Sequence, residues 1–426
     1  MIKKKNEYKI AIVGLGYVGL PVALAFSKKF YVIGFDKDEK RINSLKKGID
    51  FNGEFSKTFN SKIFYTSNKN HIADCNIYII TVPTPLKKNN IPDFSHLIDA
   101  TKTVTTYLNK NNFIIYESTV YPGATEEICL PIIEKRTGFS CNKDFFIGYS
   151  PERINPGDKK NNLKNTTKII SGSNKFSTNK IRNLYKKILN KVHVVKSIKI
   201  AEAAKIIENT QRDLNIALIN EYSLILKKMN IPIKDVLDAA KTKWNFLDFR
   251  PGLVGGHCVG IDPYYLAFKS KKIGIDPKLI MSGRKVNNLM VNEITRDIVN
   301  NINRIFKKHK NQLNILIMGA AFKENCSDIR NSKSIEVINT LCKRNHKYNI
   351  DLYDPLISSK KNYFNKKKLF KFINICQKEY YDVIIILVPH KFFIKMGLKN
   401  IISFGKKNAI IYDFKSVFDS QKVICY

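Results

Sequence analysis

The sequence predicts an α/β protein with two doubly wound domains, joined by a helical segment that contains one long central helix. Apolar stretches of strand length alternate with helical patterns up to about residue 150. The alternation gives way to a long helical pattern near residue 200 and resumes at Leu313. We therefore place domains at 1–197, 198–306 and 307–426, each long enough to form its own apolar core.

The first strand, turn and helix carry a nucleotide-binding pattern. A buried strand is expected over 9–13, then the turn Gly14-Leu15-Gly16-Tyr17-Val18-Gly19, a helix over 20–29 and a strand over 31–36. In this context G-x-G-x-x-G brings a pyrophosphate to a helix N-terminus, in a Rossmann-like domain. Asp36 ends the second strand, where a carboxylate holds ribose hydroxyls and repels a 2′-phosphate, which favours NAD over NADP. A flavin site or a domain without nucleotide is the alternative.

Two further buried strands, over 76–82 and 113–116, lead into segments that bear hydroxyl groups. Thr84 and Thr119 follow these strands, at the sheet edge where ligands bind in open α/β folds, although both could simply cap helices. The loop after the apolar stretch 145–148 carries Glu152 and Arg153, and its alternative interpretation is a surface turn.

A helical pattern over 200–229 predicts the long central helix. Lys205, Asn209 and Arg212 lie at i, i+4 and i+7 and share one face. We expect Arg212 to face solvent, and Lys205, flanked by apolar residues, to be less exposed. More helices are expected over 263–269 and 278–305.

The loop over 249–263 is rich in glycine and proline and contains Cys258, with Asp262 four residues later. Such a loop could present a thiol as a covalent nucleophile. The alternative is that Cys258 is a small buried hydrophobic residue, as most free cysteines are.

The second α/β unit opens with a strand over 313–319 and continues with strands over 349–353, 382–388 and 409–414. Its turn lacks G-x-G-x-x-G, so we predict no second dinucleotide site there. It offers Lys323, and the segment 328–332 opens a helix. A cleft between two α/β domains is the expected place for a ligand.

Composition narrows the class of partner. The formal charge is +37, but 62 of the 73 basic residues are scattered lysines, so no nucleic-acid module is predicted and an anionic substrate is favoured. The eight cysteines show no metal-ligand spacing, no metal is expected, and reduced thiols fit a cytoplasmic protein. The basic, apolar N-terminus mimics a signal peptide, yet three glycines and Pro21 interrupt it, and no uncharged run is long enough for a membrane helix.

Seven motifs occur in order: KIAIVGLGYVGLPVALAF, ITVPTP, ESTVYPG, YSPERINPGD, EAAKIIENTQRDLNIALINE, GGHCVGIDPYYL and GAAFKENCSDIRNSKS. Together they resemble the UDP-glucose/GDP-mannose dehydrogenase family over essentially the whole chain. YSPERINPGD and GGHCVGIDPYYL look like the branch that oxidises UDP-N-acetylhexosamines (UDP-GlcNAc or UDP-GalNAc). The UDP-glucose branch tends to have a carboxylate where this chain has Pro156, which argues against UDP-glucose.

The resemblance implies a four-electron oxidation of the C6 alcohol to the acid, with two NAD molecules used in succession. Cys258 would capture the aldehyde as a thiohemiacetal, and the thioester formed next would be hydrolysed. A neighbouring cation raises the thiolate fraction, and Lys205 is the candidate, with Asn209 helping to stabilise oxyanions. Thr119, Glu152 and Asp262 match positions that organise the water and the lysine, and no single general base is assigned among them.

The resemblance also implies binding residues. The cofactor contacts carried over are Gly14, Gly16, Tyr17, Val18, Gly19, Asp36, Arg41, Thr84 and Thr119. The substrate contacts carried over are Arg153, Lys205, Asn209, Arg250, Gly252, Phe322, Lys323 and Arg330. Relatives are usually homodimers or larger homo-oligomers through the central helix, and supply sugars for capsule or O-antigen.

Several alternatives stay open. Within the family, UDP-ManNAc or UDP-glucose could be the substrate, and the epimer is not decided by the residues. A two-electron hydroxyacid dehydrogenase shares the first domain and a long helix, but needs no cysteine and no third domain. A basic protein that binds nucleic acid or a membrane surface would cluster its charges and would have no use for Asp36 or Cys258.

Overall fold

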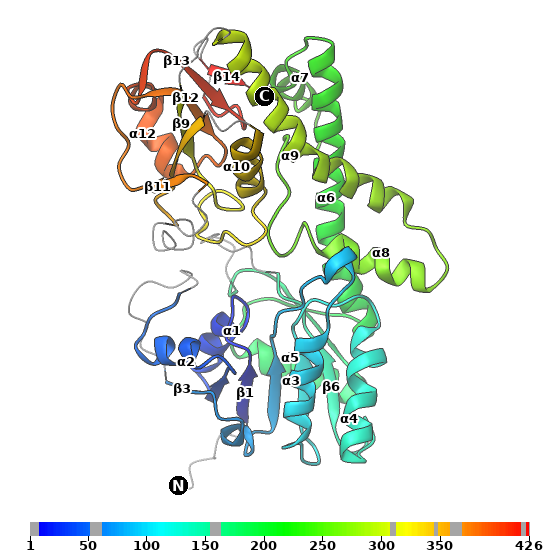
Figure 1. Ribbon diagram of the computed structural model, residues 1–426. Coiled ribbons are helices and arrows are strands. Elements are labelled where there is room, and N and C mark those ends of the chain that lie inside the picture. Colours follow the sequence, from blue (N-terminus) through cyan, green and yellow to red (C-terminus); the bar gives the residue numbers. More distant parts are fainter. Residues whose placement is uncertain are drawn as a thin grey trace. The chain divides into compact units, whose positions relative to one another are not determined.

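The computed structural model (Figure 1) describes residues 8–51, 62–153, 163–306, 312–344, 348–357, 369–418 and 423–425. The chain divides into two compact units. The first contains Met1–Asn209 and Tyr264–Pro277, and the second contains Thr210–Pro263 and Lys278–Tyr426. The division falls inside the long helix α6 (Ile198–Lys228), which is the expected central helix.

The first unit is built on an eight-stranded sheet with the order β3-β2-β1-β4-β5-β6-β7-β8. All pairs are parallel except β6 with β7. The strands are β1 (Lys9–Val13), β2 (Tyr31–Phe35), β3 (Ile63–Thr66), β4 (Ile77–Ile80), β5 (Phe113–Tyr116), β6 (Phe146–Tyr149), β7 (Lys168–Gly172) and β8 (Val192–Val194). The order reverses between β1 and β4, so the loops after these strands diverge at a switch point where open α/β sheets bind ligands.

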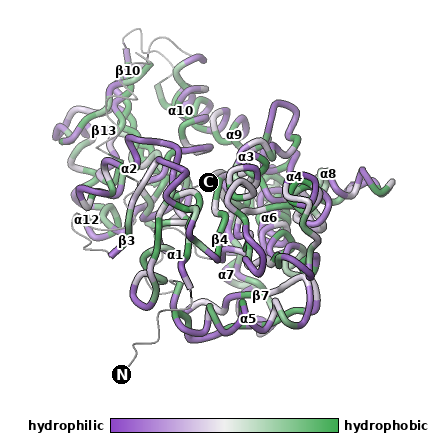
Figure 2. Tube along the Cα trace, turned by 90° about the horizontal axis from the view of Figure 1, so that it is seen from below, coloured by the Kyte–Doolittle hydropathy of each residue, from purple (hydrophilic) through white to green (hydrophobic). Residues whose placement is uncertain are grey.

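Helices of the first unit connect these strands. They are α1 (Gly19–Phe26), α2 (Glu39–Lys46), α3 (Ser95–Thr105), α4 (Leu130–Thr137) and α5 (Lys175–Lys186), with the 3-10 turns η1 (Lys69–Ile72) and η2 (Lys88–Asn90) and the π-helical turn η3 (Thr125–Cys129). Figure 2 shows α1 largely hydrophobic and α2 largely hydrophilic. This agrees with their burial, because α1 buries five of its eight residues, whereas α2 carries exposed charges on its outer side.

The second unit has a six-stranded, wholly parallel sheet with the order β11-β10-β9-β12-β13-β14. Its strands are β9 (Leu313–Met318), β10 (Tyr348–Tyr353), β11 (Lys371–Ile373), β12 (Tyr381–Ile386), β13 (Gly405–Asp413) and β14 (Val423–Cys425). Its helices are α7 (Ile233–Ala240), α9 (Lys278–Ile305), α10 (Lys333–Arg344) and α12 (Lys391–Ile402). Helix α8 (Asp262–Lys272) begins in this unit and continues into the first.

Strand β9 shows why this sheet is covered on both faces. Leu313, Ile315 and Ile317 belong to one apolar cluster together with residues of α9 and α10. Leu316 and Met318 belong to another, together with residues of α12. Because side chains alternate across a strand, a continuous apolar run needs a helix layer on each face, as parallel sheets require.

The predicted fold class is confirmed, with two parallel-sheet units and a long connecting helix. Several expected boundaries differ by a few residues. Strand β13 begins at Gly405, before the expected start at residue 409. The helix expected over 20–29 ends at Phe26, where the Lys29 and Phe30 N–H groups both donate to the Phe26 carbonyl and close a turn. Pro156 lies outside the described residues. Among the described helices, none is both long and apolar enough to cross a membrane.

Candidate active site

The glycine turn after β1 has the geometry of a phosphate-binding loop. Gly14 has φ +95°, a left-handed conformation that favours glycine, and its N–H donates to the Phe35 carbonyl at 2.8 Å. A Cβ at Gly19 would overlap the Gly14 carbonyl oxygen, so the glycine there lets α1 start close to the turn. A Cβ at Gly16 would meet no atom within 4 Å, so the side of the loop at Gly16 is open to a ligand. These residues fit a dinucleotide pyrophosphate.

Asp36 stands directly after β2, beside this turn. Its carboxylate accepts hydrogen bonds from the Leu15 N–H at 2.8 Å and the Asp38 N–H at 3.0 Å. Each oxygen has a second lone pair, and the side chain is half-buried, so capacity remains for ribose hydroxyls. The expected placement of the acid at the end of the strand is confirmed, whereas its contact with ribose stays a prediction.

Arg41 lies behind the same turn, on α2. Its Nε donates to the Leu15 carbonyl at 2.9 Å and its Nη1 pairs with Asp50 at 2.7 Å. Its Nη2 is buried without a hydrogen-bond partner among the described residues. In this structure Arg41 therefore braces the loop, and one nitrogen remains for a further acceptor.

The loops after β4 and β5 meet at the carboxyl edge of the sheet, as the sequence predicted. The Thr84 hydroxyl donates to the Thr119 carbonyl at 2.7 Å, and the Thr84 carbonyl accepts from the Tyr265 hydroxyl at 2.6 Å. Neither threonine acts as a helix cap, and Thr119 is half-buried. Tyr17 and Val18, in the turn after β1, are half-buried as well.

The candidate Glu152 belongs to a buried acid–base cluster at the same edge, whose other members were missed by sequence reasoning. Lys168 Nζ, at the start of β7, contacts Glu117 at 2.6 Å and Glu152 at 3.5 Å, and the Tyr185 hydroxyl also donates to Glu117. Burial raises the pKa of Glu117, and the two carboxylates hold the pKa of Lys168 above its usual value despite burial. Glu152 also accepts the Arg153 N–H at 2.7 Å, so its carboxylate is held at two points.

Helix α6 presents the expected lysine. Lys205 is buried, 8% exposed, as its apolar flanks predicted, and Arg212 is exposed, as expected. Asn209 is buried as well, 5% exposed. One turn earlier, Glu202 accepts from the Thr125 N–H at 3.0 Å and from the Gly123 N–H, and burial raises its pKa to about 7. Glu202 thereby ties α6 to the segment that follows Thr119.

Arg153 pairs with Glu208 of α6, at 2.6 Å between its Nη2 and Oε1, and donates to the Thr167 carbonyl at 2.8 Å. The guanidinium is therefore already paired within the first unit.

In the second unit the Cys258 loop packs against the segment that follows β9. The Gly256 N–H donates to the Asn331 carbonyl at 3.1 Å, and a Cβ at Gly256, which has φ +79°, would strike the Phe322 ring. The Cys258 carbonyl accepts from the Asp262 N–H at 2.8 Å and so starts α8. Asp262 itself is buried.

Cys258 is half-buried, as Cys141, Cys342 and Cys376 are. Cys75 and Cys129 are buried, and burial raises the pKa of each of those two thiols to about 12. Next to Cys258, burial and then Arg330 lower the pKa of His257 to about 4, so this imidazole is neutral at physiological pH. The loop presents a thiol that a substrate could reach.

The remaining substrate candidates all lie in the second unit. Arg250 pairs with Asp238 at 2.8 Å and Asp248 at 2.7 Å, and Arg330 makes a forked pair with Asp328. Lys323 Nζ lies 5.5 Å from the centre of the Phe322 ring.

Gly252 is held by the buried side chain of Asn220 on α6. The Asn220 amide accepts from the Gly252 N–H at 2.8 Å and donates to the Gly252 carbonyl at 2.9 Å. Sequence reasoning missed this amide, because an Asn inside a helix gives no local signal.

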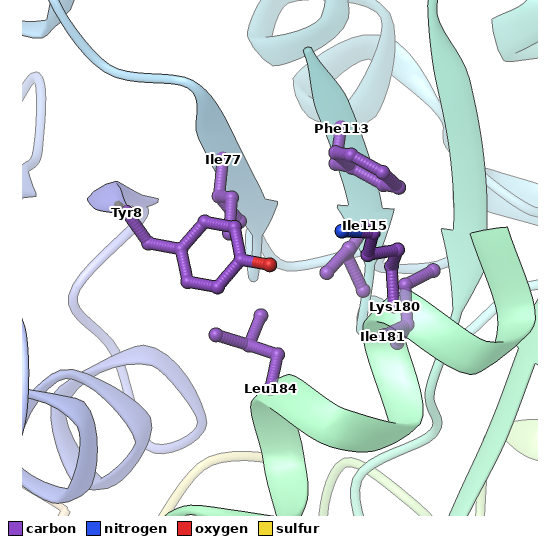
Figure 3. Close-up of a pocket in the computed structure, with 7 residues that line it drawn as sticks. All are labelled: Tyr8, Ile77, Phe113, Ile115, Lys180, Ile181 and Leu184. Carbon is purple, nitrogen blue, oxygen red and sulfur yellow. The ribbon is translucent and has the colours of Figure 1, made fainter. Parts of the chain in front are cut away.

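Two further observations concern a cavity in the first unit and metal binding. A small apolar cavity lined by Tyr8, Lys180 and residues of β4, β5 and α5 lies at the amino end of the strands, opposite the glycine turn, and has no catalytic group (Figure 3). Among the described residues, no group of three His, Cys, Asp or Glu side chains is placed to hold a metal ion.

A glycine turn beside a strand-end acid, in a chain that also has a second parallel-sheet unit and an accessible thiol, defines an NAD-dependent dehydrogenase. Three family descriptions match consecutive parts of the chain. They are the NAD binding domain (residues 8–189), the central domain (199–289) and the UDP binding domain (316–420) of the UDP-glucose/GDP-mannose dehydrogenase family.

The chain is 46% identical over 425 residues to the UDP-N-acetyl-D-glucosamine 6-dehydrogenase of Salmonella typhi, with 98% of each chain covered. It is 43% identical to Protein CapL of Staphylococcus aureus, with 97% of each covered. The solved UDP-D-ManNAc dehydrogenase of Pyrococcus horikoshii superposes with a TM-score of 0.84 at 27% identity, and 98% of each chain is covered. The chain belongs to the UDP-glucose/GDP-mannose dehydrogenase family, and its activity is that of an NAD-dependent UDP-sugar 6-dehydrogenase.

Proposed function

We propose that this protein oxidises the C6 alcohol of a UDP-N-acetylhexosamine, UDP-GlcNAc or UDP-GalNAc, to the uronic acid through a covalent intermediate on Cys258. The observation that carries the choice of substrate is the 46% identity, over nearly the whole chain, to a UDP-N-acetyl-D-glucosamine 6-dehydrogenase. The similarity to Protein CapL supports a role in capsule synthesis. A role in O-antigen synthesis and a cytoplasmic location are part of the proposal and rest on the resemblance alone.

Bound NAD supplies a hydride acceptor for each of the two oxidations. The Cys258 thiol adds to the aldehyde left by the first, and the thiohemiacetal has a C–H bond from which the second hydride leaves. Water then hydrolyses the thioester and frees the thiol. Overall, R–CH2OH, two NAD+ and one water give the carboxylate, two NADH and three protons.

Lys205 and Asn209 are the groups we assign to charge on the reacting oxygens. Lys205 is buried, so its ammonium acts in a medium of low dielectric, where its effect on an alkoxide is larger than in water. Thr119, Glu152 and Asp262 would organise the attacking water. The double anchoring of Glu152 by Lys168 and the Arg153 N–H supports a fixed carboxylate in that role.

For the nucleotide, we propose that Gly14, Gly16, Tyr17, Val18, Gly19, Asp36, Arg41, Thr84 and Thr119 contact NAD. We propose that Arg153, Arg250, Gly252, Phe322, Lys323 and Arg330 surround the UDP-sugar. Arg250 and Arg330 are now paired with carboxylates, so a pyrophosphate would have to share or replace those partners. We also propose the division at 1–197, 198–306 and 307–426, which the order of the matched NAD, central and UDP domains supports.

The stoichiometry of NADH tests the covalent route. With UDP-GlcNAc we expect two NADH per sugar consumed by wild type, and at most one by Cys258→Ser, because the aldehyde then leaves without a thiol adduct. Cys141→Ser, at another half-buried free cysteine, is the matched control and should keep a ratio of two. A ratio of one in wild type, unchanged in Cys258→Ser, would make the protein a two-electron alcohol dehydrogenase. A higher kcat/KM with UDP-ManNAc or UDP-glucose would reassign the substrate.

We also propose a homodimer through α6. Leu218, Tyr222, Ile225 and Met229 lie at i, i+4, i+7 and i+11 and are 44–59% exposed, which makes an apolar stripe on one side of the helix. Light scattering coupled to size exclusion should give twice the 49.0 kDa chain mass, and Ile225→Glu should lower it to one chain. A monomeric wild type would refute the assembly and leave the proposed reaction untouched.

A further inference from the structure

One histidine of the second unit is fully buried and touches none of the residues assigned to the reaction. His390 directly precedes α12 and has no exposed surface. Its Nδ1 accepts the Asn325 N–H at 2.9 Å, and its Nε2 lies 3.1 Å from Asp354 Oδ2. Because a backbone N–H can only donate, the ring hydrogen sits on Nε2, and His390 donates to Asp354.

Asp354 in turn holds the start of the segment that follows β9. Its Oδ2 accepts the Ala320 N–H at 2.8 Å and the Ala321 N–H at 3.2 Å. A single chain of hydrogen bonds therefore runs from Ala320 through Asp354 and His390 to Asn325. These two residues bracket the loop 320–325, which carries Phe322 and Lys323.

The far end of that loop is fixed a second time. The Asn325 side-chain oxygen accepts the Lys391 N–H at 2.8 Å, one of the free donors at the start of α12. Asn325 has φ +57°, so the chain turns sharply there. Asn325 and the segment 390–391 therefore exchange two hydrogen bonds in opposite directions, a geometry that a small shift of the loop would break.

We propose that His390, with Asp354, is a positioning residue for the nucleotide diphosphate end of the substrate, holding the loop 320–325 in its binding conformation before UDP arrives. The inference rests on the proposed contact of Phe322 and Lys323 with UDP. A loop that is already ordered loses less conformational entropy when the ligand binds, so the bracing raises affinity without touching the ligand.

Two substitutions of His390 test separately its hydrogen bond with Asn325 and its hydrogen bond with Asp354. His390→Asn keeps an oxygen near the position of Nδ1 and can still accept from Asn325, whereas His390→Gln keeps a donor near Nε2 for Asp354 and loses the acceptor. We expect titration calorimetry with UDP on the full chain to show His390→Gln weaker than wild type by on the order of tenfold, with His390→Asn in between. KM for UDP-GlcNAc should rise in parallel while kcat and the affinity for NAD stay within about twofold. His193→Gln, an exposed histidine in β8, is the control.

The proposal would be overturned if both His390 variants bound UDP as tightly as wild type. It would also be overturned if the affinities for UDP and NAD fell equally, because general destabilisation of the protein produces that result. If neither variant folds, amide hydrogen exchange on wild type decides: we expect the Asn325 amide to be protected before UDP is added, and exchange at the rate of an unfolded chain would overturn it. A wild type that binds no UDP would instead refute the proposed function on which the inference rests.

Discussion

The two sheets of this protein repeat one piece of geometry and use it differently. After β1, Gly14 has φ +95° and donates to the Phe35 carbonyl at the end of β2. After β9, Gly319 has φ +86° and donates to the Tyr353 carbonyl at the end of β10. In each case the residue directly after the second strand is an aspartate, Asp36 after β2 and Asp354 after β10. Each aspartate accepts hydrogen bonds from N–H groups of the turn that follows the first strand.

The surroundings of the two acids differ. Asp36 is half-buried and accepts two backbone N–H groups, so it has lone pairs left for a ligand. Asp354 has no exposed surface and accepts from three N–H groups, those of Ala320, Ala321 and Leu356, as well as from His390. Asp36 can therefore still accept hydrogen bonds from a ligand, whereas the carboxylate of Asp354 is occupied by groups of the protein itself.

The turns differ in length as well. In the first unit α1 begins at Gly19, five residues after Gly14, so the free N–H groups at its N-terminus lie at the glycine turn, where they favour an anion such as the proposed pyrophosphate. In the second unit α10 begins at Lys333, and the intervening residues form the loop that carries Phe322 and Lys323. The same strand pair is thus followed by a helix N-terminus in one unit and by a long loop in the other.

Gly16→Ala should have the largest effect of these variants, and the effect should be on NAD binding rather than on stability. A Cβ there meets no protein atom within 4 Å, so the free energy of unfolding should change by less than about 1 kcal/mol. The methyl group would occupy the space left for the pyrophosphate, and we expect NAD affinity to fall on the order of 100-fold. Fluorescence titration with NADH and urea unfolding of the same sample measure the two quantities.

Gly319→Ala is the mirror of that variant. Its Cβ would collide with the Val388 carbonyl oxygen at a positive φ, so unfolding should become easier while NADH affinity stays at the wild-type value. Tight NADH binding by Gly16→Ala would show that the open side of the first turn is not where the cofactor lies.

The sequence alone predicted the strands that lie at the centres of the two sheets. β1, β4, β9 and β12 are buried on both faces, so they read as continuous apolar runs. It did not predict β3, β8, β11 or β14, which are edge strands of three or four residues, and it also missed β7, the five-residue strand next to β8. A segment as short as the edge strands carries no reliable period of its own.

The residues of the candidate site also fall into those that the sequence predicted and those that it did not. The glycine turn, Asp36 and the glycine-rich Cys258 loop are local patterns, and reasoning from the residues could find them. Lys168, Asn220 and His390 act through partners 32 to 65 residues away, Glu117, Gly252 and Asn325, and no local spacing marks such a pair. Asp354 had one usable signal: like Asp36, it directly follows a strand that comes second in its unit.

Replacing Asp36 or Asp354 by asparagine tests whether the two carboxylates have different roles. Asp36→Asn removes the charge that a ribose hydroxyl would bind, so NAD affinity should fall about tenfold and the preference over NADP should shrink, with little change in melting temperature.

Asp354→Asn replaces one of two oxygens that serve four donors by an NH2 group, which leaves at least one buried donor unpaired. We expect a loss of roughly 1–3 kcal/mol in stability and an unchanged affinity for NAD. Urea unfolding and NADH titration on both variants give the answer. If Asp354→Asn instead weakened NAD binding, or Asp36→Asn mainly destabilised the fold, the two acids would not have the separate roles that their burial assigns to them.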